Sequence, residues 1–266
     1  MTKIRFLGTC SGTEPMPGMH HCSLIIEIDG VNYWFDGGEN CAHAAHTGGV
    51  NVMNTRALFV SHPHLDHTGG IANLLACMRK LAWREKRQLI HENTLDVYFP
   101  GLKLFEIIKM LACNNAEGRF KFIFNLAEHE LCEDGLVFED ERIRVSAVHN
   151  RHLGEDGTNG WHSYSFLIEA DGKRIVFSGD VAEPCELDPI IENCDFLIME
   201  TGHHPVSAVC EYAISRGVKA LRFNHHGREI LGDRAGTEKI VSDYAASANI
   251  SIKIAYDGMI EQVSDN

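Results

Sequence analysis

Four side chains that commonly bind metals lie within six residues of this chain, directly after a short apolar segment. Residues 56–60 have the composition of a buried strand and run into Ser61-His-Pro-His-Leu-Asp-His67. Side chains alternate along an extended backbone, so His62 and His64 point to the same side, and Pro63 between them fixes the backbone. Imidazole and carboxylate ligands suit zinc, manganese or iron and need no thiolate. Because packing gives no reason for such a cluster, the pattern predicts a metal site at the end of a strand.

The composition is that of an ordinary folded protein. Of 266 residues, 44% are hydrophobic and 23% are charged, which excludes a disordered or collagen-like chain. The formal net charge of −13 disfavours long-range attraction to a phosphate backbone. The nine cysteines include no C-x-x-C pair, and neither a signal-like start nor a membrane-length apolar run is present. We therefore expect free thiols in a cytoplasmic protein that does not enter the membrane.

Strand-like and helix-like patterns alternate in both halves of the chain. Strands are expected at 3–7, 22–28, 31–35, 56–60, 95–99, 119–124, 142–148, 163–169, 174–177, 196–199, 220–223 and 251–256. Helices are expected at 71–81, 102–113, 207–215 and 237–247. The chain contains no internal repeat and no Pro/Ser-rich linker. We therefore expect one domain over residues 1–266, in which two packed sheets are covered by helices.

The motif from Ser61 to Gly69 resembles the signature of the metallo-β-lactamase superfamily. Weaker matches follow in that family's order at residues 6–12 with Pro15 and Pro17, and at 34–39, 177–180, 196–201 and 219–225. The first two of these are similar to the glycine-rich start and the aspartate–glycine turn of the ribonuclease Z branch. The resemblance implies the α/β class and a four-layer αβ/βα sandwich, with metals bound at the edge of the sheets.

The resemblance also implies two divalent metal ions. Zn²⁺ is expected first, with Mn²⁺ or Fe²⁺ as the alternatives. One ion would take His62, His64 and a histidine after the strand at 142–148, and the other would take Asp66, His67 and the last histidine of the motif series. Asp180 would bridge both, because two cations about 3.5–4 Å apart need a shared carboxylate to offset their repulsion.

Two of the ligand positions have two candidates each. His149 and His152 both follow the strand at 142–148, and His152 is favoured because the family usually leaves a few residues between strand and ligand. His225 and His226 both follow the strand at 220–223, and His225 is favoured because it continues that strand into the site. The unused histidine of each pair would contact the ligands or the substrate.

The expected activity is hydrolysis of a phosphodiester by a metal-activated hydroxide. Asp66 would orient the nucleophile, and His204 or His226 would protonate the leaving oxygen. For His203, capping or a surface position is the first expectation. The alternatives are a ribonuclease Z-like enzyme that processes the 3′ end of tRNA, and a lactone or thioester hydrolase. A di-iron redox protein is disfavoured because His64 and Leu65 occupy the motif where that form carries glutamate.

The expected substrate is a small phosphodiester or a short nucleotide, and long nucleic acid is not expected to bind. Ribonuclease Z of bacteria usually carries a tRNA-gripping arm between the third histidine motif and the aspartate motif, but only 28 residues separate His152 from Asp180 here. Leu65, where that enzyme typically has glycine, also narrows the space beside the metals. A basic run from Arg79 to Arg87 points the other way, although it is typical of a solvated helix end. A homodimer is an open alternative to a monomer.

Overall fold

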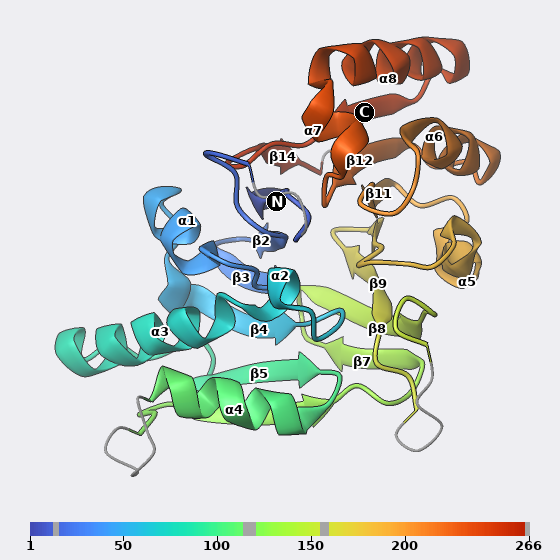
Figure 1. Cartoon of the computed structure of the whole chain (residues 1–266). Coiled ribbons are helices and arrows are strands. Elements are labelled where there is room, and N and C mark those ends of the chain that lie inside the picture. Colours follow the sequence, from blue (N-terminus) through green and yellow to red (C-terminus); the bar gives the residue numbers. More distant parts are fainter. Residues whose placement is uncertain (13–15, 114–120, 155–159, 264–266) are drawn as a thin grey trace. The chain divides into compact units, whose positions relative to one another are not determined.

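The computed structural model describes residues 1–12, 16–113, 121–154 and 160–263 (Figure 1). The chain divides into two compact units. Unit 1 consists of Met1–Gly8, His20–Leu131 and Asp257–Asn266, and unit 2 consists of Thr9–Met19 and Cys132–Tyr256. The single domain expected over residues 1–266 stays a prediction. Pro15 of the first motif and the first two residues of the strand expected at 119–124 lie outside the described residues.

Unit 1 is built on a mixed sheet of seven strands within the described residues. Their order is β14 (Ile260–Gln262), β1 (Thr2–Gly8), β2 (Ser23–Ile28), β3 (Val31–Phe35), β4 (Thr55–Phe59), β5 (Thr94–Phe99) and β6 (Asn125–Glu130). Pairing is antiparallel from β14 to β3 and parallel from β3 to β6. Asp29 and Gly30, which join β2 to β3, both have positive φ, as a two-residue hairpin turn requires.

Helices cover one face of this sheet. They are α1 (Cys41–Thr47), the 3₁₀ turn η1 (Val52–Asn54), α2 (Leu65–Thr68), α3 (Ile71–Glu85) and α4 (Leu102–Ala112). Figure 1 shows α3 and α4 over β4 and β5. The buried face of α3 repeats apolar residues at helical spacing, from Ile71 through Leu74, Leu75 and Met78 to Ala82. Packing this face on Trp34, Leu58, Val97 and other apolar residues forms the core of unit 1.

Unit 2 repeats the strand pattern of unit 1. Its order is β13 (Ser251–Ile254), β12 (Ala220–Asn224), β11 (Phe196–Glu200), β10 (Lys173–Phe177), β9 (Tyr164–Ala170), β8 (Ile143–His149) and β7 (Gly135–Glu139). Pairing is antiparallel from β7 to β10 and parallel from β10 to β13. A second hydrophobic core lies between this sheet and its helices. These helices are η2 (Pro184–Leu187), α5 (Asp188–Ile191), α6 (Val206–Ser215), α7 (Arg228–Gly232) and α8 (Arg234–Ala248). The predicted α/β class, with two sheets flanked by helices, is confirmed.

In each unit, the parallel strands bring polar residues to one edge of the sheet. The carboxyl ends of neighbouring parallel strands meet at the same edge, where α/β proteins commonly bind ligands. In unit 1 this edge receives Asp36 after β3 and the histidine motif after β4. In unit 2 it receives Asp180 after β10, Glu200 at the end of β11 and His225 after β12.

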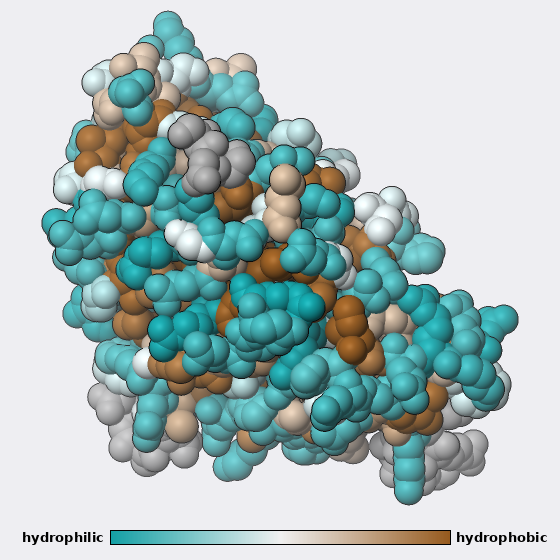
Figure 2. Space-filling model, turned by 180° about the vertical axis from the view of Figure 1, so that it is seen from behind, coloured by the Kyte–Doolittle hydropathy of each residue, from teal (hydrophilic) through white to brown (hydrophobic). Residues whose placement is uncertain are grey.

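The described surface of the protein is also mainly polar on the side shown in Figure 2. Figure 2 shows the side opposite to the view of Figure 1, where hydrophilic residues cover most of the surface and hydrophobic ones form separate patches. Among residues 1–12, 16–113, 121–154 and 160–263, no helix combines the length and apolar character that crossing a membrane requires.

Candidate metal centre

Asp36 connects the loops that follow two neighbouring strands of unit 1. It comes directly after β3, its side chain is fully buried, and its φ of 59° lies in the left-handed region. One carboxylate oxygen accepts a hydrogen bond from the Ser61 N–H at 2.7 Å. The other accepts from the Ser61 hydroxyl at 2.8 Å and from Nδ1 of His67 at 2.6 Å. These charge-assisted bonds offset the cost of burying the carboxylate, and they fix both the turn after β4 and the ring of His67.

The rings of three histidines of the motif lie against one another in this turn. The ring centroid of His62 is 4.7 Å from that of His64 and 4.1 Å from that of His67. Nδ1 of His67 donates to Asp36, and Nδ1 of His62 is 3.0 Å from the Ser61 hydroxyl oxygen. Because both contacts use Nδ1, Nε2 is the nitrogen of each ring that suits a cation.

The short helix α2 carries Asp66 next to His67. The Thr68 hydroxyl donates to the His64 carbonyl at 2.9 Å, which closes the turn around the motif. One carboxylate oxygen of Asp66 lies 3.5 Å from Nε2 of His67. Leu65 is 76% exposed and therefore takes no part in the core. The structure thus brings together the four predicted ligands of unit 1.

Glycine is required where the loop after β3 passes this motif. A Cβ on Gly38 would clash with the carbonyl oxygen of Asp66, and one on Gly70 would clash with the carbonyl oxygen of Gly38. The Gly37 N–H donates to the His67 carbonyl at 2.7 Å, and the Gly70 N–H donates to the Gly37 carbonyl at 2.9 Å. The Asp-Gly-Gly sequence after β3 is therefore explained by close backbone contact with the turn that carries the histidine motif.

Asp180 is the centre of a histidine cluster in unit 2. Its side chain is 2% exposed. Its carboxylate oxygens lie 3.5 Å from Nδ1 of His225, 3.7 Å from Nε2 of His152 and 3.9 Å from Nδ1 of His203. These distances are longer than hydrogen bonds. They approach the separation of about 3.3 Å between two ligand atoms on a tetrahedral zinc with bonds of about 2.0–2.1 Å. The cluster therefore fits a carboxylate and imidazoles that share a cation.

Glu200 is a second buried carboxylate in this cluster, and the sequence did not assign it to the site. It is 1% exposed, and its oxygens accept from the backbone N–H of His203 at 2.9 Å and from its Nδ1 at 3.1 Å. Ligand atoms of Glu200, Asp180, His203 and His225 lie within 4.8 Å of one another. His203 is thus a member of the cluster, although we expected a cap or a surface residue. A glutamate that ends an apolar strand is the signal that could have indicated this arrangement.

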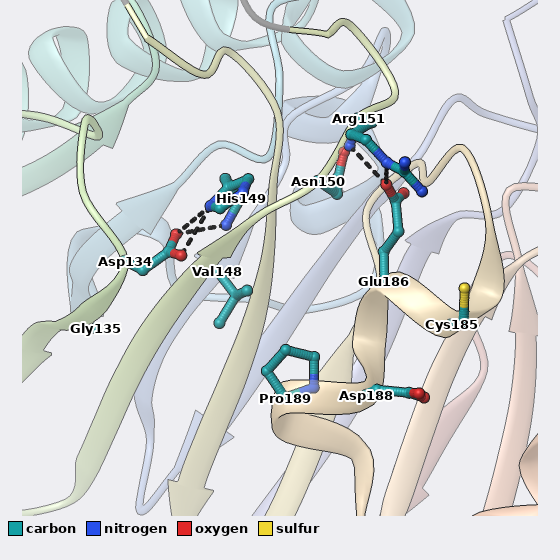
Figure 3. Close-up of a pocket in the computed structure, with 10 residues that line it drawn as sticks. All are labelled: Asp134, Gly135, Val148, His149, Asn150, Arg151, Cys185, Glu186, Asp188 and Pro189. Atoms are coloured by element: carbon teal, nitrogen blue, oxygen red, sulfur yellow. Dashed lines mark hydrogen bonds and ion pairs between the residues drawn. The ribbon is translucent and has the colours of Figure 1, made fainter.

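His149 lies in a different environment from His152. Figure 3 shows it in a pocket of unit 2, where Asp134 holds its ring and backbone. The two carboxylate oxygens of Asp134 are 2.9 and 2.7 Å from Nδ1 of His149. The backbone N–H of His149 also donates to Asp134, at 2.7 Å. The ring also stacks on Trp161 at a centroid distance of 4.3 Å. This geometry agrees with the preference for His152 beside Asp180, which stays a prediction.

His225 and His226 differ in the same way. His225 has a φ of 47°, a left-handed conformation that is rare for non-glycine residues and tends to occur at functional sites. Its Nδ1 faces Asp180. His226 is fully buried, and its Nε2 is 2.9 Å from the Ala255 carbonyl oxygen. Burial lowers the pKa of His226 to about 4, so the ring is neutral at pH 7 and its Nε2–H donates to that carbonyl. These surroundings do not favour the predicted role of His226 as proton donor.

His204, the other predicted proton donor, is also held inside unit 2. Its side chain is 10% exposed, and its Nε2 lies 3.0 Å from the Val181 carbonyl oxygen and 3.3 Å from a carboxylate oxygen of Glu200. A carbonyl oxygen can only accept, so Nε2 carries the proton and directs it into the protein. These contacts give no support to proton donation by His204, and that role stays a prediction.

The chain has relatives along most of its length. Residues 2–209 match the family described as anti-Pycsar protein Apyc1. Ribonuclease Z of Picrophilus torridus is 25% identical over an alignment of 269 positions that covers 84% of this chain and 85% of that enzyme. Ribonuclease Z of Methanothermobacter thermautotrophicus is 29% identical over 152 residues, which cover 57% of this chain and 45% of that enzyme.

Solved structures agree with this assignment at the level of the fold. Human tRNase Z, short form, superimposes with a TM-score of 0.73 at 18% identity and covers 99% of this chain and 100% of its own. YhfI of Bacillus subtilis, a metallo-β-lactamase fold protein, gives 0.73 at 17% identity, with 98% of each chain covered. The predicted αβ/βα sandwich is thereby confirmed. The family match spans more than half of the residues of this chain. The chain therefore belongs to the family of the anti-Pycsar protein Apyc1, within the metallo-β-lactamase superfamily of hydrolases.

Proposed function

We propose that the protein is a dinuclear metal-dependent phosphodiesterase that cleaves a small phosphodiester or a short nucleotide. The protein would hold two divalent ions, of which Zn²⁺ is our first choice. The proposed ligands are His62, His64, Asp66, His67, His152, Asp180 and His225. Imidazoles and carboxylates in these numbers suit zinc, manganese or iron.

The ions would lower the pKa of a shared water towards neutrality and neutralise charge on the phosphoryl oxygens. Asp66 would orient the nucleophile and accept its proton. Asp36 holds Nδ1 of His67, which keeps Nε2 in the form that binds a cation. Glu200 holds Nδ1 of His203, whose side chain is 44% exposed. We therefore propose His203, in preference to His204 or His226, as the donor of a proton to the leaving oxygen.

The segment between His152 and Asp180 is the observation that most supports a small substrate. It contains β9, the turn at 171–172 and β10, and both strands are paired within the sheet. A long tRNA-gripping arm of the kind found in bacterial ribonuclease Z would need an insertion between these two motifs. The net charge of −13 supports the same proposal, because affinity for tRNA depends on neutralising phosphates with Lys and Arg.

Removal of the 3′ trailer of precursor tRNA is the second candidate function. It is favoured by the relatives named ribonuclease Z, one of which aligns with 84% of this chain. The basic residues near the end of α3 are a local exception to the acidic composition and could contact phosphates.

We expect purified protein to contain about two equivalents of transition metal by elemental analysis, as a dinuclear centre requires. Removing the metal with a chelator should abolish hydrolysis of bis(p-nitrophenyl) phosphate, a cyclic mononucleotide or a dinucleotide, and added Zn²⁺ or Mn²⁺ should restore it. A phosphomonoester, a lactone and a thioester serve as comparison substrates. Less than one equivalent of metal, even after supply, would contradict the dinuclear centre. Micromolar binding of precursor tRNA with accurate trailer removal would instead support the second function.

His152→Ala is expected to lose more metal than His149→Ala. His152 lies beside Asp180, whereas His149 is held by Asp134 and stacked on Trp161. Loss of one ligand should weaken binding of the ion by well over tenfold, since even residues that only orient ligands contribute about 10–100-fold to metal affinity. Titration of metal-free protein with Zn²⁺ measures both variants. A greater loss in His149→Ala would show that the two histidines have the opposite roles.

A further inference from the structure

A pocket in unit 1 has no part in the proposed hydrolysis. It has a volume of about 600 Å³ and lies where α1 and η1 meet α3. Figure 1 shows α1 beside α3. The more buried lining residues are apolar, namely Ala42, Val52, Cys77 and Leu81, while the exposed cations Lys80 and Arg84 line the same pocket. The α3 residues of this set recur at three- and four-residue intervals, so they form one stripe of the helix.

The two cations of this stripe have no partner in the chain as described. Lys80 and Arg84 are four residues apart, a spacing at which like charges destabilise a helix by repulsion. Within the described residues, neither side chain makes a hydrogen bond or an ion pair. Glu85, a carboxylate of the same pocket, instead lies 3.3 Å from a guanidinium nitrogen of Arg87. The positive charge of Lys80 and Arg84 is therefore not offset locally.

The end of the helix explains only part of this charge. Cations are favourable near a helix C-terminus, but the effect falls off within the last turn. α3 ends at Glu85, so Arg84 lies in the last turn and Lys80 lies before it. In a chain with a net charge of −13, two uncompensated cations over an apolar floor form a local site of attraction for anions.

We propose that this pocket binds a small amphipathic anion, a carboxylate or phosphate carried by a short hydrocarbon chain. The anionic group would contact Lys80 and Arg84, and the hydrocarbon would lie on Ala42, Val52 and Leu81. A polynucleotide fits less well, because single strands bind through aromatic residues along a basic groove. Among the described lining residues, none is Phe, Tyr or Trp, and His46 is the one ring.

Hexyl phosphate and hexanoate are the probes, titrated by calorimetry into metal-loaded, full-length protein. Inorganic phosphate and hexanol supply the head and the tail alone. We expect both hexyl anions to bind at least tenfold more tightly than inorganic phosphate, because each buried methylene strengthens binding about fourfold. Cys77 reports occupancy of this pocket rather than of the metal centre. Its alkylation by iodoacetamide should slow when a hexyl anion is bound, while the exposed Cys132 and Cys185 react unchanged.

The double variant Lys80→Gln/Arg84→Gln should weaken the binding that protects Cys77 by at least tenfold. Lys103→Gln/Lys239→Gln removes the same charge from exposed positions of α4 and α8 and should bind as the parent does. Phosphodiester hydrolysis should be unchanged in both variants. The proposal would be overturned if a hexyl anion did not slow the alkylation of Cys77, or if it still did so in Lys80→Gln/Arg84→Gln. Loss of tRNA binding in that variant, without any binding of hexyl anions, would assign the cations to nucleic acid.

Discussion

Replacement of Asp66 by alanine is expected to reduce phosphodiester hydrolysis by about 10³-fold or more while the fold is retained. Asp66 lies in the short helix α2 beside Nε2 of His67, and its side chain belongs to neither hydrophobic core. The substitution therefore removes a proposed ligand and orienting group and leaves the apolar core side chains in place. Turnover of a small phosphodiester by metal-loaded enzyme, compared with the unfolding midpoint, measures the two effects separately.

Asp243→Ala is the matched control for this variant. Asp243 is an exposed aspartate of α8, remote in sequence from every proposed ligand. Its loss changes the net charge by the same amount and should leave turnover close to that of the parent. If Asp66→Ala also hydrolysed the substrate at nearly the parental rate, the proposed role of Asp66 in the mechanism would be wrong.

Asp36→Ala is expected to lower the free energy of unfolding by about 3–5 kcal/mol, the cost of breaking a buried charged network by removing one partner. The fully buried carboxylate accepts from the Ser61 N–H, the Ser61 hydroxyl and Nδ1 of His67. Alanine leaves these donors buried without an acceptor and opens the turn that carries the metal-ligand motif. Urea unfolding followed by circular dichroism measures the loss.

Asp36→Asn separates the role in stability from the role at the metal. The amide oxygen can still accept from the Ser61 N–H, but its NH₂ group cannot accept from Nδ1 of His67. The His67 proton then moves to Nε2, the nitrogen proposed to bind a cation. We therefore expect a smaller loss of stability than in Asp36→Ala, with a loss of about 10–100-fold in Zn²⁺ affinity. Parental Zn²⁺ affinity in Asp36→Asn would mean that Asp36 serves only the fold.

The central strands were predictable, whereas of the four edge strands in the described parts of the chain only β13 was, as the strand expected at 251–256. Buried strands such as β4 and β11 are apolar on both faces and read clearly from the sequence. β6 was expected at 119–124 but occupies Asn125–Glu130, where charged residues replace the apolar alternation. β7 and β14, also at sheet edges, were not predicted, since the described residues of these strands are mostly exposed. An edge strand is fixed by its one neighbour more than by its own composition.

The proposed metal-ligand motif was visible because its residues are adjacent in sequence, but the contacts that support these residues were not. Asp36 and His67 are 31 residues apart in sequence, and the backbone turn after β3 places the Asp36 carboxylate within hydrogen-bond distance of His67. Glu200 and His203 are close in sequence, yet their approach to Asp180 depends on the parallel pairing of β10 with β11. The choice between His149 and His152 likewise depends on Asp134, which binds His149 after the chain has folded.

The pairing of β1 with β14 has a consequence for how the chain folds during synthesis. Lys3 pairs with Gln262, and Arg5 with Ile260, so β1 obtains one of its two neighbours only after more than 250 further residues have been synthesised. Residues 9–19 belong to unit 2, so neither unit is a continuous segment. Such non-local contacts slow folding and prolong the exposure of unpaired strand edges. We therefore expect a nascent chain that stops before residue 257 to leave β1 open on one side and to require chaperones.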